Sequence, residues 1–230
     1  MIQASWNVSR MQGLGFAYAV SPLARAEGEP GRPEASALLA RHLQRFNTHP
    51  YLAAPLIGSV IRLETENNSS EAADLKNALM GPYAAIGDSF FWSSLRPFSG
   101  IAAACLALEG FILAPLLFLA LYSPAHLWVR VRGFMTGWQQ GKNGIEFIRR
   151  LDLPEKSRWT RWCSTLLLGI AAFLASATEP SHTLFQPHVL GHVGGLLVVL
   201  ASFLAVRKGL SVLTILYGSV IFFAVVVMMQ

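Results

Sequence analysis

Apolar residues gather in long runs in the second half of this chain and in short pieces in its first third. Three runs, at residues 101–122, 189–206 and 211–229, approach or reach the roughly 20 residues that cross a bilayer core as a helix. A fourth run at 163–177 is shorter, so it either spans with a tilt or forms a buried or re-entrant helix. The pattern predicts an all-α integral membrane protein with about four transmembrane helices.

Residues 33–46, PEASALLARHLQRF, have the spacing of a helix with two unlike faces. Leu39, Leu43 and Phe46 share one face, and two arginines lie on others. Such an amphipathic N-terminal helix is expected to lie in the membrane interface, with its apolar face toward the lipid.

Two apolar segments of the first third are short or interrupted. Residues 51–63 are too few to span, and residues 79–95, LMGPYAAIGDSFFWSSL, contain Gly81-Pro82 and Gly87-Asp88. These features predict re-entrant or broken helices. Irregular backbone at membrane depth is tolerated only where protein buries it or a wet cavity receives it. A substrate site is therefore expected in this part of the chain.

The composition supports a membrane protein. Of 230 residues, 53% are hydrophobic and 13% are charged, which is too apolar for an ordinary soluble domain. The formal net charge is +5, and basic residues are densest at 130–162. The positive-inside rule makes that stretch a cytoplasmic loop, so we attribute its charge to lipid headgroups and not to nucleic acid. The sequence thus divides into residues 1–100, with the interrupted segments, and residues 101–230, with the transmembrane helices and this basic loop.

Asp88 is an ionisable residue inside an apolar segment, where a charge is costly enough to need a reason. One reading is an N-cap for the helix that Phe90 would begin, and the other is a role in substrate binding or coupling. Glu109 is placed similarly, but Gly110 and Pro115 beside it indicate a kink whose free donors it would satisfy.

Asn47, Thr48 and His49 stand directly before Pro50 and an apolar run. Proline disfavours helix at the residue before it, so one reading of the three is a helix C-cap and a turn. The other reading is a set of donors and acceptors for a sugar, because polyols are bound by amides, imidazoles and carboxylates beside aromatic rings. Trp6, Tyr83 and Trp92 are the candidate rings.

Other motifs point to packing. Gly133, Gly137 and Gly141 recur every four residues, which favours close helix contact. Cys105 and Cys163 have no metal-binding spacing, and no disulfide is implied. A metal site is the less favoured reading of three histidines near the C-terminal runs, and no catalytic residue or resident cofactor is expected. Those histidines are His182, His188 and His192.

Four strings occur in an order that resembles one known family. They are QASWNVSRMQGLGFAYAVSP at 3–22, RHLQRFNTHPYLAAPLIG at 41–58, LMGPYAAIGDSFFWSSLRP at 79–97 and GFMTGWQQGKNG at 133–144. The family is the IID component of the mannose/fructose/sorbose phosphotransferase systems. The strings cover most of the first 145 residues.

The resemblance implies a function and partners. A IID chain pairs with a IIC membrane chain in the bacterial cytoplasmic (inner) membrane, and such heterodimers associate as trimers. A hexose of the mannose type crosses and is phosphorylated by a phosphohistidine of the IIB protein, which IIA supplies. The IID chain itself is not phosphorylated. The polar motif residues that the resemblance marks for substrate binding are Gln12, Asn47, Thr48, His49, Asp88, Trp92 and Arg96.

Within the string at 79–97, this chain departs from the family pattern at two positions. Ala85 replaces a usual glycine, and Ser89 replaces a usual proline after the Gly-Asp pair. Both changes alter the backbone freedom of that segment. They motivate an alternative function, a regulatory or structural membrane adaptor that still binds IIC but no longer moves sugar.

Overall fold

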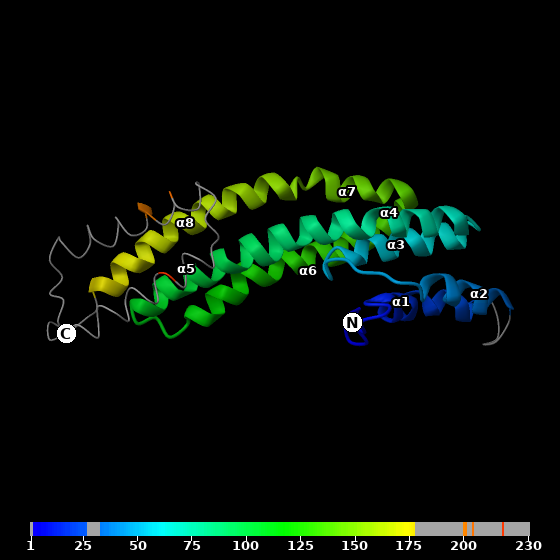
Figure 1. Ribbon diagram of the computed structural model, residues 1–230, viewed down its shortest axis with the longest axis horizontal. Helices are drawn as coiled ribbons and strands as arrows, with labels where there is room; N and C mark the ends of the chain where they lie inside the picture. The colour runs from blue at the N-terminus through cyan, green and yellow to red at the C-terminus, as the bar shows by residue number, and fades with distance from the viewer. Residues whose placement is uncertain (1, 27–32, 178–199, 202–203, 205–217, 219–230) are drawn as a thin grey trace. The chain divides into compact units, whose positions relative to one another are not determined.

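A computed structural model describes residues 2–26, 33–177, 200, 201, 204 and 218 (Figure 1). The chain divides into two compact units, Met1–Ala172 and Phe173–Gln230. Among the described residues the structure is helical, apart from turns and two isolated bridges, so the expected all-α class is confirmed. The elements are α1 (Gly13–Ala26), α2 (Pro33–His42), α3 (Ala53–Thr65), α4 (Ser69–Gly87), the π-helix η1 (Asp88–Leu95), α5 (Arg96–Leu108), α6 (Ala114–Gln140), the 3₁₀-helix η2 (Gly141–Gly144), α7 (Ile145–Arg150) and α8 (Leu153–Ala177).

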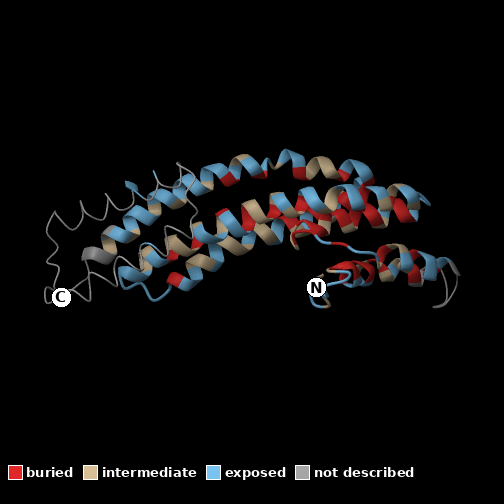
Figure 2. Cartoon of the chain, viewed as in Figure 1, coloured by how far each residue is buried: buried red, intermediate tan, exposed pale blue. Residues whose placement is uncertain are grey.

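Helices α3 and α6 pack so closely that their backbones are in contact at glycine positions. A Cβ added to Gly137 would lie 2.3 Å from the carbonyl oxygen of Pro55, and one on Gly58 would lie 2.3 Å from that of Phe134. The interpretation of the spaced glycines as packing residues is confirmed for Gly133 and Gly137, which both face Pro55. Buried side chains concentrate on α1 to α4 and the adjoining part of α6, whereas α8 is mostly exposed (Figure 2).

The expected amphipathic helix at 33–46 forms but ends at His42, four residues early. Phe46 leaves the helix because its carbonyl accepts a hydrogen bond from the Gln12 N–H at 2.8 Å, which ties this segment to the start of α1. The face that α2 buries is Ala35, Leu38 and His42, one position away from the predicted stripe.

The expected break at 79–95 is wrong. Helix α4 continues through Gly81 and Pro82, and the chain then winds as a π-helix into α5 without leaving helical backbone angles. Asp88 has φ −62° and ψ −42° with no capping hydrogen bond, so the N-cap reading is wrong as well. The wide turn is compatible with the fold because the hydroxyls of Ser94 and Ser157 donate to the Ser89 carbonyl at 2.7 and 3.1 Å.

The apolar run at 101–122 is not one straight helix. Helix α5 ends at Leu108, Gly110 takes the left-handed φ of 81°, and α6 begins at Ala114, so the chain reverses and α5 packs on α6 (Figure 1). Glycine adopts that angle without strain, which is why the kink expected at Glu109 becomes a complete turn. Phe111 and Ile112 at the turn are 60% and 90% exposed.

The basic stretch at 130–162 is mostly helical, since it holds the end of α6, η2, α7 and the start of α8. In the described part of the chain, one helical stretch, Ala114–Ala172, is long and apolar enough to cross a membrane by length and composition. The expected spans at 189–206 and 211–229 fall almost entirely outside the described residues, as do His182, His188 and His192.

Candidate functional site

Gln12 fixes the segment between α2 and α3. Its side-chain Nε2 donates to the Thr48 carbonyl at 2.7 Å, and the Thr48 N–H donates to its Oε1 at 3.1 Å. Both residues are buried. The side-chain amide of Gln12 therefore satisfies both backbone hydrogen-bonding groups of Thr48, as a neighbouring strand would, and holds the segment in place.

His49 lies at the point where this segment meets the π-helix. Its ring stacks on Phe91 with centroids 5.2 Å apart and meets the edges of Tyr51 and Trp92 at 4.8 Å each. Only Gly87 leaves room for it, because a Cβ there would lie 2.3 Å from the Cβ and Cγ of His49. The strings at 41–58 and 79–97 are thus brought together.

Burial sets the protonation of His49. The side chain is 1% exposed, and burial lowers its pKa to about 4, so the ring is neutral at pH 7. The Tyr51 N–H donates to Nδ1 at 3.3 Å, which assigns the ring proton to Nε2. Nε2 is buried without a hydrogen-bond partner among the described residues, and so is the Thr48 hydroxyl.

The remaining predicted site residues are more open. Trp92 is 42% exposed, Asn47 and Arg96 are exposed, and Asp88 is partly buried. The structure joins Gln12 to Thr48 and His49 to Trp92, but Asn47, Asp88 and Arg96 make no side-chain hydrogen bond within the described residues. Among the candidate rings, Tyr83 is buried at 4% exposure and Trp6 is 51% exposed. The pockets described for this chain are lined by other residues.

Helix α6 adds residues that the sequence reasoning missed. The Tyr122 hydroxyl lies 3.1 Å from that of Tyr51, the His126 ring stacks on Tyr51 at 4.4 Å, and the Arg130 guanidinium lies over the same ring. Tyr122, His126 and Arg130 recur every four residues, which places them on one helix face. This four-residue spacing is the sequence feature from which the three residues could have been predicted to act together. The aromatic cluster extends from His49 to α6 through Tyr51.

A second missed feature is a buried carboxylate. Glu64 of α3 accepts hydrogen bonds from Arg41 at 2.9 Å, Ser69 at 2.8 Å and His42 at 2.9 Å. Burial by itself raises the pKa of Glu64, but the hydrogen bonds from these three residues outweigh it and lower the pKa. Burial lowers the pKa of His42, so its contact is a hydrogen bond from a neutral ring. Glu64 therefore ties α2 to α3 and to the first turn of α4.

Lys76 is buried next to this carboxylate cluster. Its Nζ donates to the His42 carbonyl at 3.2 Å and lies 4.9 Å from the Phe16 ring centroid. Burial lowers the pKa of Lys76 to about 8. An ammonium group with a carbonyl and an aromatic face as partners is unusual in a protein interior.

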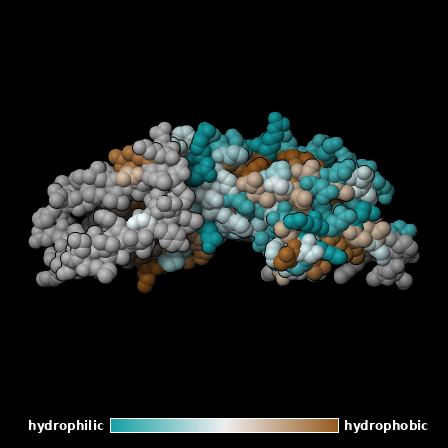
Figure 3. Space-filling view, viewed as in Figure 1, coloured by the Kyte–Doolittle hydropathy of each residue, from teal (hydrophilic) through white to brown (hydrophobic). Residues whose placement is uncertain are grey.

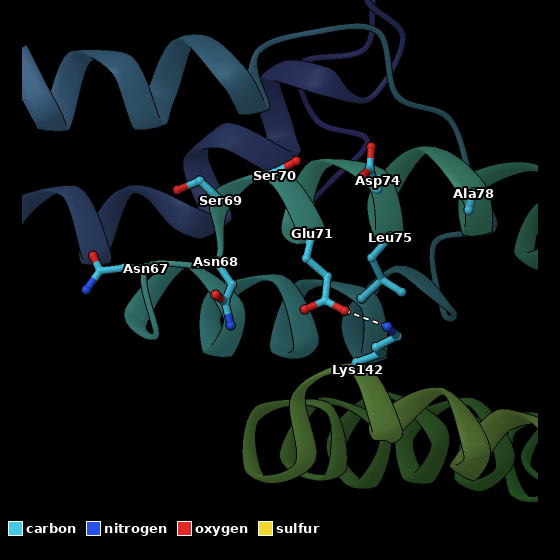
Figure 4. Close-up of a pocket in the computed structure, with 9 residues that line it drawn as sticks. All are labelled: Asn67, Asn68, Ser69, Ser70, Glu71, Asp74, Leu75, Ala78 and Lys142. Carbon is cyan, nitrogen blue, oxygen red and sulfur yellow. Dashed lines mark hydrogen bonds and ion pairs between the residues drawn. The ribbon is translucent and has the colours of Figure 1, made fainter.

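Two grooves flank the helices. An open polar groove of about 600 Å³ lies between the α3–α4 turn and η2, and Lys142 reaches across it to Glu71 at 2.6 Å (Figure 4). Hydrophilic side chains also cover much of the end of the unit that holds α3, α4 and α7 (Figure 3). An apolar groove of about 760 Å³ lies between α1, α3 and α6, with Arg130 and Thr65 as its polar members.

Comparison with known proteins gives the context for this arrangement. The fold is similar to a solved structure described as a membrane protein, with a TM-score of 0.72 and 28% identity over 99% of this chain and 90% of that one. It is also similar to the mannose transporter ManYZ solved in complex with microcin E492, with a TM-score of 0.57 and 28% identity over the same shares. The fold is thus of a class found in helical membrane proteins.

The sequence relatives narrow that class. A profile of the PTS system mannose/fructose/sorbose family IID component matches residues 1–180. The mannose-specific EIID component of Escherichia coli K12 is 37% identical over 185 residues, and the fructose permease IID component of Bacillus subtilis is 34% identical over 178. The matches cover 76% and 75% of this chain but 63% of each relative's length. The chain belongs to the mannose/fructose/sorbose family of IID components.

Proposed function

We propose that this chain is the IID subunit of a hexose permease in a bacterial cytoplasmic membrane, where it forms the sugar path together with a IIC chain. IIB phosphorylates the sugar and IIA supplies IIB, so this chain provides no phosphorylated residue. Its contribution is to hold part of the path and the surface that contacts IIC. The family match and the likeness to ManYZ support this assignment.

The observation that carries the proposal is the contact of His49 with Gly87 and Trp92. Two segments 38 positions apart in sequence meet here through a contact that only glycine permits. The meeting point leaves Trp92 part exposed on the π-helix, next to the polar residues Asp88 and Arg96. π-Helices are frequent at functional sites.

The proposed roles follow from burial. Gln12, Thr48 and His49 are sealed by protein, so we assign them to positioning. The open residues are assigned to sugar contact: the exposed part of Trp92 stacks on the C–H face of the ring, and polar side chains bond its hydroxyls. Those polar side chains are Asn47, Asp88 and Arg96. The IIC chain completes the site, and the heterodimers associate as trimers.

A transport assay tests the function. The chain is coexpressed with its cognate IIC and IIB, and phosphoenolpyruvate-dependent phosphorylation of hexoses is measured in vesicles. Activity with at least one hexose is expected, and Trp92→Ala is expected to reduce it strongly without loss of the heterodimer. Trp159→Ala removes a tryptophan that is 63% exposed on α8 and belongs to none of the proposed sugar contacts, so it is the matched control and should keep activity. Absence of activity with every hexose, while another family member works in parallel, would reject the proposal.

The second candidate function is the non-transporting adaptor, which Ala85 and Ser89 favour because they alter the Gly-Asp segment. Ser89 is here engaged in a serine cluster with Ser94 and Ser157. Direct binding of a hexose to the purified heterodimer separates the two functions. Saturable binding supports the permease, and assembly without any sugar binding supports the adaptor.

A further inference from the structure

Helix α8 changes character along its length. Its first three turns carry Lys156, Arg158 and Arg161 together with Trp159 and Trp162, which are 63% and 69% exposed. The following turns are apolar and equally open, with Leu166 at 70% and Leu168 at 57% exposed. Basic residues interleaved with tryptophans, followed by exposed leucines, are what is met on passing from lipid headgroups into hydrocarbon.

Arg161 is held at this boundary by three hydroxyl groups. Its Nη1 donates to Ser157 at 2.8 Å, to Ser89 at 3.3 Å and to Ser94 at 3.4 Å. Ser94 and Ser157 are fully buried, and their hydroxyls lie 2.6 Å apart. The cluster joins the π-helix to α8. The Nη1 side of the guanidinium is therefore held by serines of these two helices.

The charge of Arg161 is not neutralised by a carboxylate within the described residues. The other exposed arginines of α7 and α8 do have one: Arg149 and Arg150 lie within 4 Å of Glu146, and Arg158 lies 2.5 Å from Glu155. All bonds of Arg161 in this part of the chain use Nη1 alone. Its Nε and Nη2 donors have no partner among the described residues, and the side chain is exposed.

We infer that Arg161 binds the phosphate of an anionic phospholipid, whose acyl chains lie along the exposed apolar turns of α8. A guanidinium held on one side loses less conformational entropy when its other donors bind a phosphate. A lipid is favoured over a soluble phosphate because Trp162 and the leucines that follow Arg161 along the helix fit a headgroup followed by acyl chains. Arg161 is not one of the proposed sugar contacts, although Ser89 and Ser94, which hold it, lie on the same π-helix as Asp88 and Trp92.

The test is a lipid-binding titration with the purified full chain in mild detergent. Phosphatidylglycerol and phosphatidylcholine, each with a fluorophore on an acyl chain, are compared by fluorescence anisotropy. Arg161→Gln is expected to weaken phosphatidylglycerol binding about fivefold, the effect of one basic side chain at the membrane surface, and to leave phosphatidylcholine unchanged. The matched control Arg149→Gln removes the same charge from an 82% exposed arginine on α7 and should change binding by less than about twofold.

Two further experiments test whether the serine cluster positions Arg161 and whether the bound phosphate belongs to a lipid. Ser157→Ala keeps the charge but removes the shortest of the three bonds to Arg161, and a smaller loss than that of Arg161→Gln is expected. Binding should persist in a large excess of inorganic phosphate. Equal binding of both lipids, equal losses in Arg161→Gln and Arg149→Gln, or displacement by inorganic phosphate would each overturn the inference.

Discussion

Gly87 and His49 fit against each other so closely that a Cβ on Gly87 would lie 2.3 Å from two carbon atoms of the His49 side chain. Neither residue is near the other in sequence. The contact joins the segment after α2 to the start of the π-helix, and it places Phe91 and Trp92 around the same imidazole. One glycine therefore decides how two motifs of the chain are arranged.

Gly87→Ala should destabilise the folded chain by roughly 1–3 kcal/mol, because the added methyl forces His49 out of its position. The measurement is thermal unfolding of the purified protein. Gly81→Ala is the matched control: it lies in the same helix, no atom would be within 4 Å of its Cβ, and it should keep or slightly raise the melting temperature. Equal effects of the two substitutions would contradict the importance of this contact.

Glu64→Gln should cost roughly 3–5 kcal/mol, because it removes the charge that Arg41 and two further donors pair with in the interior. Glu66→Gln, two residues after Glu64 but in an exposed ion pair with Arg62, should cost less than about 1 kcal/mol. Denaturant unfolding measures both. The folded-state pKa of Glu64 is lowered, so its contribution is complete above the ordinary carboxyl pKa and is lost as the pH falls below it.

His49 should make stability fall on mild acidification. Burial lowers its pKa to about 4, so the unfolded chain, with a histidine pKa of about 6.5, binds more protons between these two values. Its contribution is therefore complete above about pH 6.5 and declines as the pH falls toward 4. His49→Phe should flatten the melting temperature between these values, whereas Thr48→Val, which adds or removes no titrating group, should leave the slope intact. A slope unchanged in His49→Phe would rule out this residue as its source.

Lys76→Met should keep or raise stability at neutral pH, because the wild-type chain must desolvate an ammonium group that lacks a carboxylate partner in the described structure. The folded-state pKa is lowered to about 8, so wild-type stability should rise as the pH passes from about 8 toward 10.5, and the variant should not show this rise. The test is to measure the melting temperatures of the wild type and of Lys76→Met from about pH 8 to pH 10.5. A loss above roughly 2 kcal/mol in the variant would show that the bond to the His42 carbonyl outweighs desolvation.

The helical class was predictable because long apolar runs dominate the sequence, but the positions of the turns were not. The run at 101–122 reads as continuous because Phe111, Ile112 and Leu113 are as apolar as the helices they connect. Gly110 marked the turn, and a hydropathy pattern cannot distinguish a reversal from a kink. Conversely, Gly81-Pro82 reads as a break, although Pro82 is exposed and the helix continues through it.

The sequence names candidate site residues one by one, but it does not predict which of them the fold brings together. The motifs named His49 and Trp92, which the structure joins, and also Asn47 and Arg96, which it leaves exposed. Glu64 and His42 could not be paired from sequence because 22 positions separate them and neither belongs to a repeating pattern. Burial, which only the fold determines, decides which of these groups position others and which remain open to a ligand.

The π-helix between Gly87 and Arg96 has a mechanical consequence. If one of its turns tightened to α-helical winding, α5 would rotate about its own axis relative to α4, and the aromatic rings on the wide turn would swing away from the imidazole they enclose. Ser94 and Ser157 hold the winding in its wide form by bonding the Ser89 carbonyl. The wide winding is therefore held both from within the π-helix, by Ser94, and from α8, by Ser157, which lies more than sixty residues further along the sequence.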